Sequence, residues 1–202
     1  YTYILSKIRK RQIATNGKFI VISDVIKTFI AQYHDQNNLI TIPFSVFENN
    51  GILPTEESKD SHLRICLPGY VSQTRRDYFG LMKMLESNES NSIKENITWD
   101  FLGGIPIEGQ ADEIVKRAKD LIAKGYKIIL YEKNSVSLNE FDEQLNKADL
   151  ILGNLMIDHG AKSTYGKSME SGLPFSMIKK AKPCLMIKGY NYPINLQSSV
   201  VE

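Results

Sequence analysis

Short apolar runs alternate with longer amphipathic segments along most of the chain. Apolar runs of about six residues are typical of buried strands, whereas apolar residues at every third or fourth position are typical of helices. Strands are therefore expected at 18–23, 38–43, 63–68, 97–104, 126–131, 148–155 and 183–189. Helices are expected between most of them, at 24–33, 75–87, 111–124 and 137–147. This alternation predicts an α/β fold with a doubly wound parallel sheet that helices cover on both faces.

Sequence signals also mark the ends and the burial of individual elements. Ser137 with Glu140 three residues later forms a capping box, which is expected to open a helix. Gly125 follows the last apolar position of the helix at 111–124 and is expected to end it. The run at 18–23, KFIVIS, is apolar at nearly every position, which predicts a strand buried on both faces.

An irregular, acidic stretch at 45–60 divides these elements into two sets, and its Asn, Gly, Pro and Glu residues are typical of a connection between domains. We therefore expect the end of an incomplete N-terminal α/β unit at 1–48, a linker at 49–61 and a C-terminal Rossmann-like domain at 62–202. The chain begins at Tyr1 without Met, which indicates a fragment of a longer protein.

Residues 1–14 are expected to form a basic helix. Its apolar side carries Ile4, Leu5 and Ile8, and its cations are Lys7, Arg9, Lys10 and Arg11. Such a basic side is usually a solvated face, and peripheral contact with an anionic membrane is the alternative.

The composition excludes several classes of partner. The chain of 202 residues has 25 Lys and Arg against 23 Asp and Glu, so it lacks the basic excess typical of nucleic-acid binding. No apolar run is long enough to span a membrane, and we expect a cytoplasmic protein. Cys66 and Cys184 lie in predicted buried strands and are expected to stay reduced. His34, His62 and His159 have no zinc-site spacing, so no metal is expected.

The clearest candidate site is the polar loop at 162–172 and the helix that follows it. The first N–H groups of a helix have no partner within the helix, and with the helix dipole they attract phosphate. Ser171 is a candidate N-cap, Pro174 suits the first turn, and Gly172 would let an anion approach the backbone.

A second loop is expected to reach the same place. In open parallel sheets, ligands bind beyond the carboxyl ends of the strands, where the strand order reverses. If the strands at 63–67 and 151–152 flank that point, the loop at 68–76 meets the loop at 162–172. Arg75 and Arg76 would enter a helix there, where positive charge is unfavourable unless an anion binds; the alternative is that both are surface residues.

Two common phosphate motifs are missing. Gly69 stands alone in its loop, so the G-x-G-x-x-G turn of dinucleotide-binding domains is not present, and no Walker motif occurs. Nicotinamide and P-loop chemistry are therefore not indicated.

The order of these segments resembles glycosyltransferases of the two-domain GT-B type, in the large group that includes many bacterial polysaccharide and lipopolysaccharide enzymes. The segments that carry the resemblance are KFIVISDVIKTFIAQYHDQNNLITIPFSVFE, ICLPGYVSQTRRDY, KADLILGN and ESGLPFSMIKKAKPCLMIKG. The first is similar to the end of the N-terminal domain of that group, and the others are similar to the donor-binding domain.

The resemblance implies roles for individual residues. The amides of Gly172 and Leu173 would face the donor's diphosphate, the backbone near 135–137 would hold the base, and Glu170 would bind the transferred sugar. The implied donor-binding set is Gly69, Arg75, Arg76, Ser137, Tyr165, Glu170, Ser171, Gly172 and Leu173.

The implied activity is transfer of a sugar from a UDP- or GDP-linked donor to a saccharide or lipid-linked acceptor. No Asp-x-Asp motif occurs, so no metal or other cofactor is expected. In this group the other catalytic contacts come largely from the N-terminal domain, so no catalytic residue is assigned and the fragment alone is expected to be inactive. Asp158 and His159 could face the cleft or be solvated.

The chain departs from the group's pattern at two positions. Met169 and Met177 occupy the places where this group usually has glutamates on either side of the Gly-Leu-Pro segment. The departure favours one alternative, a nucleotide-sugar-binding module without catalysis. Another is a regulatory α/β module that pairs with partner proteins and exposes an apolar patch.

Overall fold

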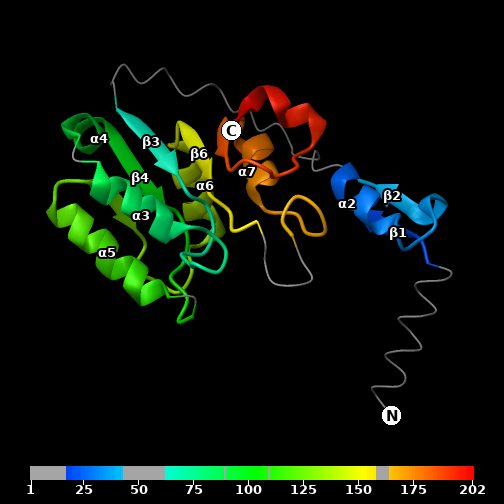
Figure 1. The fold of residues 1–202 in the computed structure, drawn as a ribbon, viewed down its shortest axis with the longest axis horizontal. Coiled ribbons are helices and arrows are strands. Elements are labelled where there is room, and N and C mark those ends of the chain that lie inside the picture. Colours follow the sequence, from blue (N-terminus) through cyan, green and yellow to red (C-terminus); the bar gives the residue numbers. More distant parts are fainter. Residues whose placement is uncertain (1–16, 43–61, 89, 109, 158–163) are drawn as a thin grey trace, which may run out of the picture.

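The computed structural model describes residues 17–42, 62–88, 90–108, 110–157 and 164–202. These residues form two separate parallel sheets, one of two strands and one of six (Figure 1). The predictions for the basic N-terminal helix, the linker, and the pair Asp158 and His159 concern residues outside the described ones.

The smaller sheet belongs to the N-terminal unit. Strand β1 (Phe19–Val21) pairs in parallel with β2 (Leu39–Thr41), and α2 (Asp24–Ile30) and a short 3-10 helix (Gln36–Asn38) connect them. The side chain of Ser23 caps α2, because its hydroxyl accepts a hydrogen bond from the Ile26 N–H at 3.3 Å. The predicted strand–helix–strand unit is confirmed.

The prediction that the run at 18–23 is buried on both faces is wrong. Val21 is buried, but the alternate residue Ile20 is 66% exposed. Ile22, Ile40 and Ile42 are exposed as well. The register pairs Ile20 with Ile40, so these isoleucines form one exposed apolar face. The sequence shows that such a strand is apolar, but it does not show what covers each face.

The larger sheet contains six parallel strands. They are β3 (Leu63–Cys66), β4 (Ile97–Phe101), β5 (Lys127–Leu130), β6 (Leu150–Gly153), β7 (Cys184–Met186) and β8 (Val200–Val201). Their order is β5-β4-β3-β6-β7-β8, which in chain order is the 3-2-1-4-5-6 arrangement of doubly wound, Rossmann-like sheets. The predicted α/β class and parallel sheet are confirmed.

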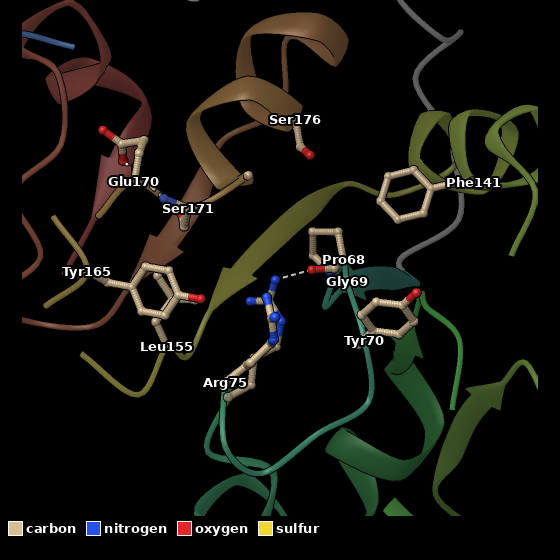
Figure 2. A pocket seen from close by; sticks show the side chains of 12 residues that line it. Pro68, Gly69, Tyr70, Arg75, Phe141, Leu155, Tyr165, Glu170, Ser171 and Ser176 are labelled. Carbon is tan, nitrogen blue, oxygen red and sulfur yellow. Dashed lines mark hydrogen bonds between the residues drawn. The ribbon is translucent and has the colours of Figure 1, made fainter. Parts of the chain in front are cut away.

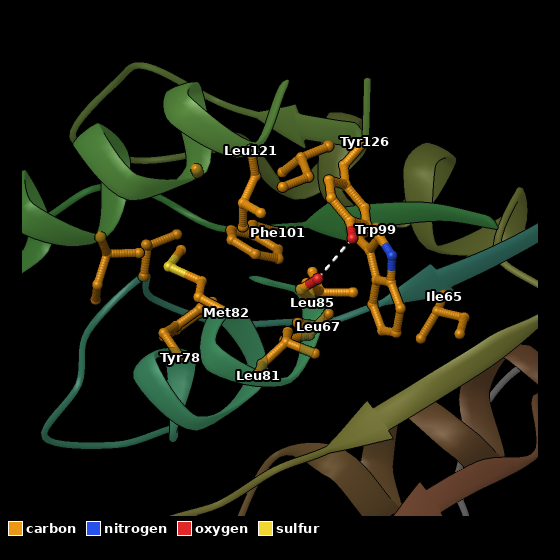
Figure 3. Close-up of a cluster of buried hydrophobic side chains, with 14 residues drawn as sticks. Ile65, Leu67, Tyr78, Leu81, Met82, Leu85, Trp99, Phe101, Leu121 and Tyr126 are labelled. Atoms are coloured by element: carbon orange, nitrogen blue, oxygen red, sulfur yellow. Dashed lines mark hydrogen bonds between the residues drawn. The ribbon is translucent and has the colours of Figure 1, made fainter. Parts of the chain in front are cut away.

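Helices cover this sheet in two layers (Figure 1). On one face α3 (Tyr78–Ser87) and α5 (Ala111–Ala123) pack over β3, β4 and β5, with α4 (Asn91–Asn96) leading into β4. The other face carries α6 (Leu138–Asn146) and α7 (Leu173–Lys180). Each layer has its own apolar core, and Figure 3 shows the one beneath α3 and α5.

The helix boundaries agree with most of the sequence signals. Ser137 caps α6 by accepting a hydrogen bond from the Glu140 N–H at 3.3 Å, as expected, and Gly125 follows the end of α5 with φ of +92°. Helix α3 begins three residues later than predicted, because the carboxylate of Asp77 caps it at the Gly80 N–H, 2.9 Å away. Arg75 and Arg76 therefore lie in the loop before the helix.

Both cysteines are buried and free, as expected. Burial raises the pKa of the Cys66 thiol and raises that of Cys184 to about 12. None of the helices in the described part of the chain combines the length and the apolar character that a membrane span requires.

Candidate functional site

The strand order reverses between β3 and β6. These two strands are direct neighbours, with Ile65 opposite Leu150 and Cys66 opposite Ile151. The chain leaves β3 toward β4 on one side and returns to β6 on the other side. The predicted switch point is therefore confirmed, and the loops after β3 and β6 begin side by side.

Backbone hydrogen bonds hold these two loops together. The Asp77 N–H donates to the Asn154 carbonyl at 2.9 Å, and the Met156 N–H donates to the Arg75 carbonyl at 3.0 Å. The loop after β3 thus runs along the start of the loop after β6, and this places both arginines beside the segment that leads to α7.

A cavity of about 260 Å³ opens where the loops meet (Figure 2). It is lined by Pro68, Gly69, Tyr70, Arg75, Arg76, Phe141, Leu155, Tyr165, Glu170, Ser171, Gly172 and Ser176. Most of the donor-binding set expected from the sequence lies in this lining. The exceptions are Ser137, an exposed cap of α6, and Leu173, which is fully buried in the core.

Arg76 is a buried cation with an unbalanced charge. Its side chain is 7% exposed and donates a hydrogen bond to the Pro68 carbonyl, while Nη1 is buried without a partner among the described residues. Within the same residues its guanidinium forms no ion pair. Burial lowers the pKa of Arg76. Since an unpaired buried charge is costly, this cation favours an anion in the cavity.

Gly69 makes room for this guanidinium. Its φ is +114°, a conformation that residues with a side chain rarely adopt, and a Cβ there would lie 3.0 Å from Arg76 Nη2. Arg75, by contrast, is exposed and reaches the cavity from solvent. The loop after β3 therefore supplies one buried and one exposed cation.

Gly172 leaves space on the opposite wall. It is the N-cap of α7, one residue after the predicted cap Ser171, and its φ of −73° and ψ of −3° suit any residue. A Cβ at this position would meet nothing within 4 Å. Neither the backbone conformation nor the packing therefore requires glycine here. Because Gly172 also lines the cavity, the space beside it is open to a ligand.

Ser171 uses its hydroxyl inside the protein. The Leu173 N–H donates to Ser171 Oγ at 3.2 Å, and Pro174 has no N–H. The Leu173 amide therefore bonds inside the protein in this structure, and its expected contact with a diphosphate stays a prediction. Among the described residues, the Gly172 N–H has no hydrogen-bond partner. This amide at the start of α7 can therefore donate to a ligand.

The carboxylate of Glu170 is bonded to a residue that the sequence did not single out. Tyr190, which follows β7 and is 2% exposed, donates its phenol to Glu170 Oε1 and lies 3.3 Å from Ser171 Oγ. In Figure 2 the Glu170 side chain points away from Arg75. The predicted contact with a transferred sugar stays a prediction.

Sequence reasoning did not single out Phe141, Leu155 and Ser176 of the lining. Ser176 lies four positions after Gly172, so it faces the same side of α7, and this spacing could have identified it. Phe141 of α6 and Tyr70 present aromatic rings (Figure 2). Tyr70 belongs to the loop at 68–76 that was expected here, whereas no sequence signal pointed to Phe141. Met177, in the place of the second glutamate of the GT-B pattern, is buried in the core instead.

No family model matches this chain, and no curated protein matches it.

The arrangement suits an anion with an aromatic group attached. Arg75, Arg76 and the start of α7 attract negative charge, whereas Tyr70 and Phe141 offer ring faces. The volume is below the range of about 300–1,000 Å³ that is usual for whole ligands, so the cavity would hold the charged part of a larger molecule. In the described part of the chain, no group of three or more His, Cys, Asp or Glu residues could hold a metal.

Proposed function

We propose that this chain is the donor-binding part of a glycosyltransferase of the two-domain GT-B type. Its donor would be a UDP- or GDP-linked sugar, and its acceptor a saccharide or a lipid-linked acceptor in polysaccharide or lipopolysaccharide synthesis. In this proposal residues 1–48 are the end of the N-terminal domain, 49–61 the linker and 62–202 the donor domain. The protein would act in the cytoplasm, with contact to a membrane surface as an alternative.

One observation carries the proposal. The two loops that resemble the donor-binding loops of that group converge on one cavity at the switch point, with a cation on one wall and an open glycine on the other. The implied donor-binding set draws on both loops, and a shared cavity is what such a site requires.

The proposed chemistry is displacement at the anomeric carbon of the sugar. The acceptor oxygen forms a bond to that carbon while the bond to the diphosphate oxygen breaks, and the acceptor proton goes to a base expected in the N-terminal domain. Negative charge grows on the leaving diphosphate. Arg75, Arg76 and the Gly172 N–H would stabilise it, and each well-placed donor is worth about 3–4 kcal/mol in other enzymes.

A binding module without catalysis is the nearer alternative. Met169 and Met177 favour it, because neither supplies the carboxylate that the GT-B pattern has at its position. A regulatory α/β module is the other, and the exposed face of Ile20, Ile22 and Ile40 favours it. Only the regulatory module predicts no affinity for nucleotides.

Calorimetric titration with UDP, GDP and their sugar conjugates tests the proposal on the chain as it stands. We expect saturable binding of one nucleotide. Gly172→Asp should weaken it at least about tenfold, since a carboxylate would occupy the place of the diphosphate. The open space at Gly172 makes misfolding an unlikely cause of any loss.

Ser90→Asp provides the matched control. Ser90 is the N-cap of α4 and makes no capping hydrogen bond, so the substitution also adds a carboxylate at a helix start. Because α4 precedes β4, the change lies at the amino edge of the sheet and should leave the affinity unchanged. Binding that persists in Gly172→Asp would place the site elsewhere, and no binding by the folded chain would favour the regulatory module.

A further inference from the structure

The hydrogen-bond network of Tyr190 links the segment after β7 to the cavity wall. Glu170 Oε1 accepts from the Tyr190 phenol and from the Ser171 N–H, the latter at 3.3 Å. Glu170 Oε2 is buried without a partner among the described residues. The carboxylate therefore depends on Tyr190 for its strongest hydrogen bond.

Without the hydrogen bond from Tyr190, the Glu170 carboxylate could weaken the attraction of the cavity for an anion. Glu170 lines the same cavity as Arg75 and Arg76, and a carboxylate that turned toward them would neutralise the charge that attracts a ligand. Arg76 has a free Nη1 to receive it. In the structure the side chain points the other way (Figure 2), into the network with Tyr190.

Burial keeps the phenol a donor. Desolvation raises the pKa of Tyr190, and the nearby Glu170 carboxylate raises it further. The hydroxyl is therefore protonated at neutral pH and can donate to the carboxylate.

We propose that Tyr190 is a positioning residue: it holds the Glu170 carboxylate away from Arg75 and Arg76 and so keeps the cavity cationic. This inference rests on the proposed function, in which the cavity binds the diphosphate of a nucleotide.

The test compares Tyr190→Phe with Tyr190→Phe/Glu170→Gln in titrations with UDP and GDP. The single variant should bind the nucleotide about tenfold more weakly, because the carboxylate is released toward the arginines. In the double variant the neutral amide cannot neutralise them, so most of the affinity should return. UDP and GDP lack the sugar that would be transferred, so a contact of Glu170 with that sugar does not enter the comparison.

Tyr126→Phe is the matched control. Tyr126 is also buried, and its phenol donates to the Leu85 and Asn88 carbonyls on the other face of the sheet (Figure 3). Loss of the Tyr126 hydroxyl should lower the free energy of unfolding in urea as much as loss of the Tyr190 hydroxyl does. It should leave the nucleotide affinity unchanged. If Tyr190 only stabilises the fold, Tyr190→Phe and Tyr126→Phe should bind the nucleotide with the same affinity.

The outcomes separate this inference from the proposed function. Wild-type affinity in Tyr190→Phe, or equal weakening in the single and double variants, overturns the role of Tyr190 and leaves the donor site standing. A wild-type chain that binds no nucleotide overturns the proposed function and this inference with it. Urea unfolding of the same variants shows in each case whether they fold.

Discussion

At the scale of single residues, Arg76 links structure to function most closely. Its guanidinium is buried, it bonds to the Pro68 carbonyl, and its charge has no partner among the described residues. Burial of an unpaired charge costs several kcal/mol. Under the proposed function, an anionic ligand in the cavity supplies the missing negative charge and offsets part of that cost.

Arg76→Met tests this explanation. The substitution removes an unpaired buried charge, so the free energy of unfolding in urea should stay within about 1 kcal/mol of wild type or rise. Nucleotide affinity should fall at least about tenfold, as expected for a lost charged hydrogen bond.

Arg117→Met serves as its control, because Arg117 pairs with Glu86 at 2.9 Å on the surface of α5. Affinity should not change in that variant. A large loss of stability in Arg76→Met with unchanged affinity would show instead that Arg76 only fastens the loop at Pro68.

At the scale of elements, the strand order separates the two cysteines. Cys66 of β3 lies opposite Ile151 of β6, which in turn lies opposite Cys184 of β7. With strands about 4.8 Å apart, the two cysteines are roughly 10 Å from each other, which is beyond the reach of a disulfide. Their thiols are also fully buried, and burial raises the pKa of each.

The reactivity of the Cys66 and Cys184 thiols therefore tests the strand order of the large sheet. At pH 8 neither thiol of the folded chain should react with a thiol-specific reagent, because both are inaccessible and protonated, and both should react in urea. Mild oxidation of the folded chain should produce no internal disulfide. A disulfide that forms without unfolding would contradict the placement of β6 between β3 and β7.

The elements themselves could be predicted from the apolar pattern wherever a segment was a continuous apolar run or had a clear helical period. The five longer strands of the large sheet and the stripe of α5 were predicted for this reason. Among the elements that were not predicted, α4 has no buried residue and β8 has only two residues. The start of α3 was missed because Asp77 caps it from within a stretch that looked helical.

Residues of the site could be predicted only where local sequence determines them. Gly69 and Gly172 stood in loops that precede helices, and general rules for parallel sheets brought those loops together. Tyr190 is 20 positions away from Glu170, and Phe141 belongs to another helix. Their contribution depends on the tertiary fold, which no local pattern encodes.

At the scale of the whole molecule, more than one cavity opens at the carboxyl edge of the large sheet. Besides the one at the switch point, a wider hollow of about 470 Å³ lies beyond β4 and β5. It is lined by Ile105, Pro106, Ile107, Asp112, Val115, Glu132, Lys133 and Asn134. Two acids and only one cation line that hollow, so an anionic ligand should choose the switch point.

The central claim is that a nucleoside diphosphate binds at the switch point, and amide chemical shifts of the ¹⁵N-labelled chain test it most directly. On titration with UDP or GDP, the largest changes should fall on Gly69, Arg76, Gly172 and Ser176, which line one cavity from two loops. Changes confined to Ile107, Asp112 and Asn134, or no changes in the folded chain, would contradict the claim.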